Sequence, residues 1–246
     1  MIEVGPENRK YHVHKALIVY HSEFFNGAFN GTTKEADEGL IHMEDIDPSS
    51  GTFSALAPTY NKLTSSTVNI FVHWLYTQGI PRFENKTHWD SILEYPKNKA
   101  SSKHVLTLLK AYVFGDRIIA PAFRLAMNNA IADYYPIAIE TPEPIVAIVQ
   151  YAFDNIPPDR VVLMLLVNDF CQHWKEKLDK NNETLKLFPQ QFVFRVMRRL
   201  SVIYHMTPEE RAKNYCAHEH KSEEMRKRCR DLHMVFDKER DYGHFV

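Results

Sequence analysis

Apolar and polar residues alternate in two short segments near the start of the chain, residues 2–4 and 10–13. Alternation with a period of two is typical of half-buried β-strands. Between these segments, residues 5–8 read Gly-Pro-Glu-Asn, which favours a turn. The pattern therefore predicts a β-hairpin with a very short first strand. Residues 40–43 are a candidate for a further strand.

From residue 14 onward the apolar spacing changes to every three or four residues, which is typical of amphipathic α-helices. Ser22 directly precedes Glu23 and is an N-cap signal for the second helix. Helices are predicted in every segment with this spacing, namely residues 14–20, 23–29, 68–76, 104–119, 121–135, 142–153, 158–178 and 188–204.

Two long segments are mainly polar. Residues 82–103 are rich in Lys, Asn and Ser and predict a surface loop, in which Trp89, Ile92 and Leu93 fit one helical turn. Residues 208–240 are highly charged and poor in aliphatic side chains. This composition leaves two alternatives for the second segment, an exposed helix or a partly disordered chain.

The composition is that of a soluble globular protein, with 44% hydrophobic and 25% charged residues in a chain of 246 residues. This length suits one large domain or two small ones. The formal net charge is -1 and the pI is near 6.9, so the chain as a whole has no electrostatic signature of nucleic-acid or membrane binding.

The sequence carries no sign of export or membrane insertion. Residues 1–6 lack the basic and apolar regions of a signal peptide, and the longest aliphatic run, residues 161–167, is far shorter than the roughly 20 residues of a membrane span. The three cysteines are too few for a disulfide framework. We therefore expect a cytoplasmic or nuclear protein that does not associate with membranes.

Several blocks of sequence occur in the order found in BTB/POZ domains and resemble that family. They are residues 11–17 (YHVHKAL), 22–29 (SEFFNGAF), 34–36 with 41–43, 71–77 (FVHWLYT) and 108–119. Residues 74–77 and 111–116 look like the filamentous-fungal type of this domain, and residues 160–170 and 188–192 are similar to a helical tail that follows it there.

The resemblance implies an α+β BTB/POZ fold, a helical cluster flanked by a small sheet, over residues 1–135. An all-α C-terminal extension follows over residues 136–246. The implied function is a non-enzymatic protein–protein interaction module, a scaffold or adaptor that binds other proteins, with self-association as a further option. By the same analogy, a partner docks on the exposed faces of the first helical hairpin, around Leu17, Ile18 and Tyr20.

Two departures from the family pattern affect the expected partners. The first strand is short, and because such an edge donates few ladder hydrogen bonds, a strand-swapped dimer is doubtful. The signature for cullin-3 binding has an acidic residue where this chain has Ile70, so cullin-3 binding is doubtful as well.

Residues 50–66 interrupt the family pattern. Removing them joins residues 45–49 to residues 67–71 and restores the expected sequence. Two explanations remain open, a lineage-specific surface loop and a translated intron or gene-model error. In either case we expect the segment to lie outside the core.

The strongest candidates for metal chemistry are Cys216, His218, His220 and Cys229, since thiolate and imidazole are suitable zinc ligands. On a continuous helix, however, the Cys-x-His-x-His spacing places neighbours on different faces, and no Cys-x-x-Cys pair is present. We therefore expect no metal and no cofactor. His14 fits a structural role at the corner between strand and helix.

Basic residues are concentrated in the C-terminal half, in two groups at residues 195–199 and 221–230. Acidic neighbours offset the second group, so we do not expect nucleic-acid binding. The alternative function is a zinc- or nucleic-acid-binding regulator that uses this segment. No Gly-rich phosphate loop, nucleophile elbow or His-Glu-x-x-His motif occurs, so an enzyme is not expected. The helical spacing assigns seven aromatic residues to the core, Phe24, Phe25, Phe29, Phe71, Trp74, Tyr76 and Tyr112.

Overall fold

The computed structural model describes residues 1–4, 9–32, 34–43, 65–80, 89, 91–92, 101–138, 142–173, 183–207 and 216–229. Contacts within the chain divide it into two units, Met1–Ile156 and Pro157–Val246. Each unit has its own core and is described by itself. The domain boundary expected after residue 135 stays a prediction.

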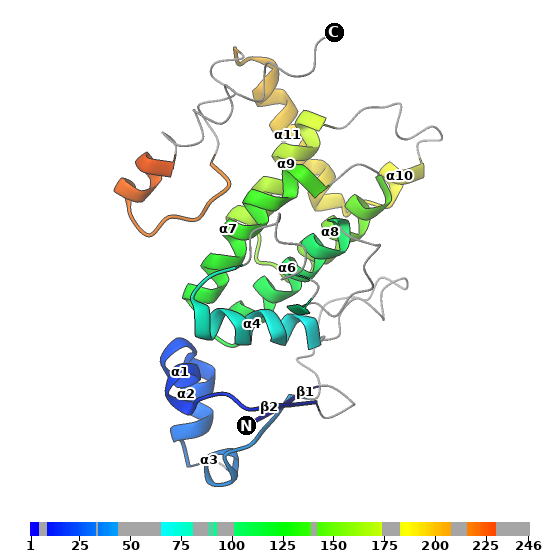
Figure 1. Cartoon of the computed structure of the whole chain (residues 1–246). Coiled ribbons are helices and arrows are strands. Elements are labelled where there is room, and N and C mark those ends of the chain that lie inside the picture. Colours follow the sequence, from blue (N-terminus) through cyan, green and yellow to red (C-terminus); the bar gives the residue numbers. More distant parts are fainter. Residues whose placement is uncertain are drawn as a thin grey trace. The chain divides into compact units, whose positions relative to one another are not determined.

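A three-stranded sheet lies at the N-terminus, with β1 (Ile2–Val4) between its two neighbours (Figure 1). β2 (Arg9–Tyr11) pairs with β1 antiparallel, which confirms the predicted hairpin. β3 (Ile41–Met43) pairs with β1 parallel and confirms the candidate strand at residues 40–43. Ile2 and Val4 are buried, so one face of β1 contributes to the core.

The other face of the sheet carries a buried carboxylate. Glu3 is 7% exposed, and its Oε1 atom lies 3.3 Å from Nζ of Lys10, on β2. Its Oε2 atom lies 2.8 Å from Nδ1 of His42, on β3. Since a buried carboxylate needs partners, these two contacts tie the three strands together on the side away from the core.

Three short helices connect β2 to β3. They are α1 (Lys15–His21), α2 (Glu23–Asn30) and α3 (Lys34–Glu38). Ser22 caps α2 as predicted, because its Oγ atom accepts a hydrogen bond of 3.2 Å from the backbone nitrogen of Phe25. The same hydroxyl donates to the carbonyl oxygen of Ile118 at 2.5 Å. Ser22 is buried, so it fixes the start of α2 against the residues that follow α6 (Ser101–Arg117).

The core of the first unit is aromatic and joins α2 to α4 (Ser65–Thr77), α6, α7 (Pro121–Ala138) and α8 (Pro142–Asn155). Five of the seven aromatic residues assigned to it are buried, Phe25, Phe29, Phe71, Trp74 and Tyr112. The assignment is wrong for Phe24, which is 41% exposed, and for Tyr76, which is 47% exposed. Both are on helix faces that the core does not cover.

The segment expected to be an insert, residues 50–66, overlaps the start of α4. Ser66 is a helical residue and is buried, so the expectation that the whole segment lies outside the core is wrong at this end. Residues 50–64 and most of the predicted loop 82–103 lie outside the described residues. Within that loop Trp89 and Ile92 are buried, and the side chain of Asn69 donates to the carbonyl oxygen of Ile92.

The second unit contains α9 (Val161–His173), α10 (Glu183–Lys186) and α11 (Gln190–Tyr204). The rings of Phe170, Phe188 and Phe192 contact one another with centroids 5.0–5.3 Å apart and form its aromatic core. A further short helix covers residues 223–229. Within the described ranges, no helix has both the length and the apolar character that crossing a membrane requires.

The close approach of α6 and α7 leads to a test of the fold. A Cβ atom on Gly115 would lie 2.8 Å from Cδ1 of Phe123 and 3.2 Å from the backbone nitrogen of Arg124. Backbone atoms cannot move away cheaply, so we expect Gly115→Ala to lower the free energy of unfolding by about 1–3 kcal/mol.

Gly27 provides the matched control, because a Cβ atom there meets nothing within 4 Å. Gly27→Ala in α2 should leave the free energy of unfolding unchanged or raise it by about 0.5–1 kcal/mol, since alanine favours helix. Both values are measured by chemical denaturation. Equal unfolding midpoints for the two variants would contradict the close packing of α6 and α7.

Candidate functional site

The exposed face of the first helical hairpin is centred on Tyr20, whose side chain is 83% exposed at the end of α1. Phe24, at the start of α2, is 41% exposed and is the other exposed aromatic residue of this hairpin. Ile18 is only 1% exposed, so the expectation that it lies on an exposed face is wrong. Leu17 is half-buried. Of the three residues predicted to receive a partner, Tyr20 is therefore the one that the structure leaves freely accessible.

His21 connects this surface to the core. Its ring lies edge-on to Tyr20, with centroids 4.8 Å apart, and contacts Trp74 of α4 at 4.9 Å. Burial lowers the pKa of His21, which favours the neutral ring. Nε2 of Gln78 lies 3.3 Å from Nε2 of His21, so the neutral imidazole can accept from this amide. The imidazole ring that contacts Tyr20 is therefore held in place by Trp74 in α4 and by Gln78, which follows α4.

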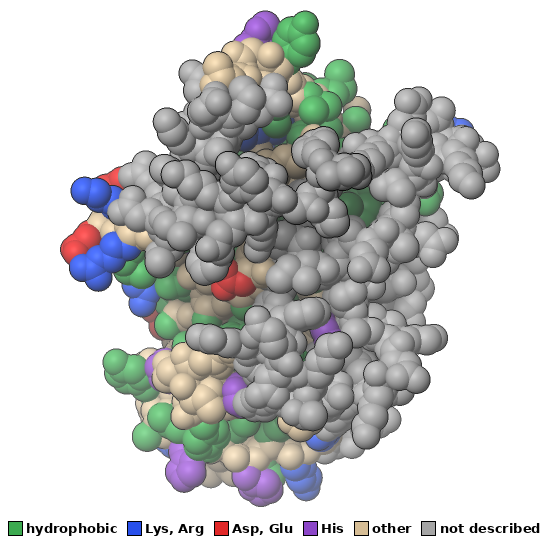
Figure 2. Space-filling model, turned by 45° about the horizontal axis from the view of Figure 1, so that its top comes forward, with side chains coloured by type: hydrophobic (Ala, Val, Ile, Leu, Met, Phe, Trp, Pro, Cys, Tyr) green, Lys and Arg blue, Asp and Glu red, His purple; other side chains and the backbone are tan. Residues whose placement is uncertain are grey.

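His14 has the structural role predicted for it at the corner between β2 and α1. Its Nδ1 atom lies 2.7 Å from Oη of Tyr76, and its backbone nitrogen donates to the same oxygen at 3.2 Å. The exposed ring of Tyr76 therefore has a polar partner. Figure 2 shows hydrophobic side chains and histidines side by side near the lower edge of the view.

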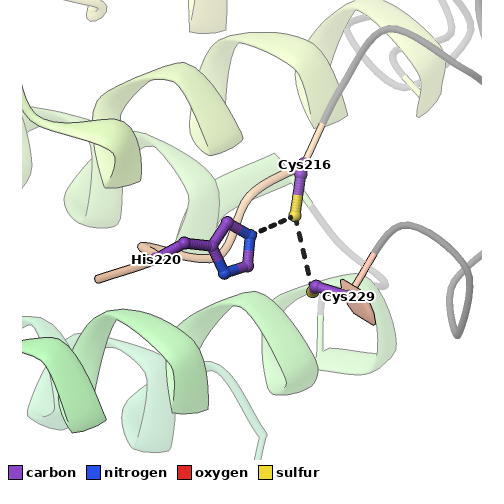
Figure 3. A group of neighbouring side chains, drawn as sticks. All are labelled: Cys216, His220 and Cys229. Atoms are coloured by element: carbon purple, nitrogen blue, oxygen red, sulfur yellow. Dashed lines mark hydrogen bonds between the residues drawn. The ribbon is translucent and has the colours of Figure 1, made fainter. Parts of the chain in front are cut away.

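A second group of side chains gathers in the C-terminal segment. Sγ of Cys216 lies 3.2 Å from Nε2 of His220 and 3.6 Å from Sγ of Cys229 (Figure 3). Nδ1 of His218 is 3.8 Å from the same sulfur. Residues 216–222 are not helical, so the argument that a helix would separate these residues is wrong. The structure brings together Cys216, His220 and Cys229, and it places His218 next to Cys216.

α11 has an exposed apolar face that was not predicted from the sequence. Val193, Phe194, Met197, Leu200 and Tyr204 are all exposed, whereas Phe192 and Val196 on the same helix are buried. The spacing of 193, 197, 200 and 204 is the signal that could have revealed this face, because steps of four and three follow one side of a helix. α11 therefore has apolar residues on both its buried and its exposed side.

Two basic residues of the C-terminal segment are paired with acidic ones, as the spacing predicted. Arg226 lies 3.2 Å from Glu223, and Arg228 lies 2.6 Å from Glu224. At the left edge of Figure 2, basic and acidic side chains lie next to one another. Pairing of this kind lowers the local positive potential and so gives little support to nucleic-acid binding.

Comparison with known families identifies the N-terminal part of this fold. Residues 1–56 match the family model of the BTB/POZ domain. The chain contains a BTB/POZ domain. The match includes the three strands and α1 to α3, and the complete architecture is an α+β BTB/POZ fold with a helical extension. No match was found among curated proteins or among solved structures.

BTB/POZ domains generally mediate protein–protein interaction and commonly self-associate. The match therefore supports protein binding as the class of function. The matched residues also contain both helices of the hairpin that carries Tyr20 and Phe24. The exposed aromatic face therefore belongs to the part of the chain for which a family is identified.

Proposed function

We propose that this chain is a non-enzymatic adaptor or scaffold of the filamentous-fungal BTB/POZ type, acting in the cytoplasm or nucleus. It binds a second protein through the face formed by Tyr20 and Phe24, here called the α1–α2 face. The match to a BTB/POZ domain supports the class of function.

The main observation behind this proposal is that the side chain of Tyr20 is exposed while the ring of its neighbour His21 is held in place. Aromatic side chains that combine apolar area with a polar end dominate the energetics of many protein interfaces. Tyr20 is largely exposed, yet its neighbour His21 is fixed by Trp74 and Gln78. A surface of this kind loses little conformational entropy on binding, because its supporting groups are already ordered.

The position of Ile70 supports a partner other than cullin-3. Ile70 is 1% exposed in α4, so its side chain packs in the core. The residue that aligns with the acidic position of the cullin-3 signature therefore offers no charged contact at the surface.

Photo-crosslinking from the α1–α2 face tests the proposed docking site. A photoreactive phenylalanine in place of Tyr20 should crosslink the full chain to a second protein in native extract, identified by mass spectrometry. With that protein purified, we expect Tyr20→Ala to weaken binding by about 30-fold, the effect of losing roughly 2 kcal/mol at an interface hot spot.

Tyr204 is the matched control, since its side chain is 82% exposed but lies on α11. Tyr204→Ala should leave the dissociation constant of the same complex unchanged. Crosslinks that form only from position 204, or a Tyr20→Ala variant that binds as tightly as the unmodified chain, would contradict docking on the α1–α2 face.

The sheet leads to a prediction about self-association. β1 is paired with β2 on one side and with β3 on the other, and Glu3 bonds to residues of both neighbours. β1 has only three residues and both its edges are already paired within the chain, so it can donate few ladder hydrogen bonds to a second chain and we expect a monomer or a weak dimer. Light scattering should give the monomer mass at micromolar concentration, and a dimer that persists at nanomolar concentration would overturn this prediction.

A further inference from the structure

The three separations between Cys216 and its neighbours in the cysteine–histidine group are close to the edge lengths of a tetrahedron around a metal ion. Zinc binds thiolate at about 2.3 Å and imidazole at about 2.0–2.1 Å, so two sulfurs on one zinc ion lie about 3.8 Å apart and a sulfur and a nitrogen about 3.5 Å apart. The sulfurs of Cys216 and Cys229 are 3.6 Å apart, and the two imidazole nitrogens lie 3.2 and 3.8 Å from Cys216.

The same separations do not describe a disulfide, whose sulfurs lie about 2.05 Å apart. The ligand atoms of Cys216, His220 and Cys229 all lie within 4.8 Å of one another, which makes them the one group of this kind among the residues that the structure describes. His218 lies at the edge of this group, and its ring stacks on that of His220 with centroids 6.4 Å apart. In Figure 3 the side chains of the three central residues converge on one point.

The backbone explains why these residues meet. Residues 216–222 form an irregular loop, which lets Cys216 and His220 approach each other although four positions separate them. The helix over 223–229 then places Cys229 at its last residue. The loop and the far end of the helix thus bring their ligand atoms to the same place.

The segment also lacks the usual source of stability. None of residues 216–229 is fully buried, and Met225 is 43% exposed. An isolated helix this short is unstable in water, and small folded segments without a core generally depend on metals or disulfides. The least exposed positions are 216–220 and 229, which include all four candidate ligands, whereas residues 221–228 are exposed.

We propose that Cys216, His218, His220 and Cys229 bind one zinc ion and that this ion holds the segment 216–229 in its folded form. Two thiolates and two neutral imidazoles neutralise the charge of the ion and suit its tetrahedral preference. Four protein ligands leave no open position for substrate, so the site is structural rather than catalytic. The site is independent of the α1–α2 face and extends the proposed adaptor function.

Metal analysis of the purified full chain tests the proposal. Under reducing conditions the protein should contain about one zinc ion per chain. After replacement of zinc by cobalt, the absorption spectrum should show the intense visible bands of tetrahedral Co²⁺ and a thiolate-to-cobalt charge-transfer band. A protein without bound zinc, a Co²⁺ spectrum typical of octahedral oxygen ligands, or a Cys216–Cys229 disulfide in place of the metal would overturn the site.

Variants assign the metal to these residues. Cys229→Ser and His220→Ala should lose zinc, and Cys229→His, which still offers a ligand, should retain it. Cys171→Ser is the matched control, because Cys171 lies in α9 and burial raises the pKa of its thiol to about 11. Its sulfur contacts the carbonyl oxygen of Val196 at 3.9 Å. Zinc retained in Cys229→Ser, or lost in Cys171→Ser, would contradict the assignment.

Hydrogen exchange separates loss of the site from loss of the fold. Chelation of zinc should speed amide exchange over residues 216–229 and leave exchange over residues 101–138 unchanged. If exchange over 216–229 does not respond to chelation, the ion does not hold this segment and the proposed structural role fails.

Discussion

The aromatic core of the first unit depends on the contacts that the ring of Phe71 makes with three other helices. The centroid of this ring lies 6.3 Å from Phe25 of α2, 5.5 Å from Phe114 of α6 and 5.0 Å from Phe123 of α7. Phe25 lies in the segment that matches the BTB/POZ model, and the other three residues follow it. Aromatic pairs at such distances add to the apolar area they bury. The α1–α2 face is therefore held in place by helices beyond the matched residues.

Most of the fold could be predicted from periodicity, because the period of two and the helical spacing report which side of an element is buried. The hairpin, the strand at β3 and the cap at Ser22 follow from the sequence alone. Burial at single positions does not. Phe24 was expected in the core and is exposed, whereas Ile18 was expected at the surface and is buried. Which of these side chains is covered depends on where α4 and α6 pack, and the local sequence pattern does not contain this information.

The candidate sites, too, could be predicted only in part from the sequence. Tyr20 could be predicted as a docking residue by analogy with the family. The contact of its neighbour His21 with Trp74 could not be predicted, because these two residues are far apart in the chain. On a continuous helix, the spacing of Cys216, His218 and His220 argues against a shared metal site. The loop at residues 216–222 reverses that conclusion, and its shape could not be deduced from ligand spacing alone.

The central claim, that the α1–α2 face receives another protein, is tested most directly by hydrogen exchange on the complex. Amide exchange is measured for the chain alone and with a saturating amount of the partner identified by crosslinking from Tyr20. The proposed function predicts slower exchange over residues 15–30, with no change over residues 190–204. Slower exchange confined to residues 190–204 would contradict the claim and place the partner on the exposed face of α11.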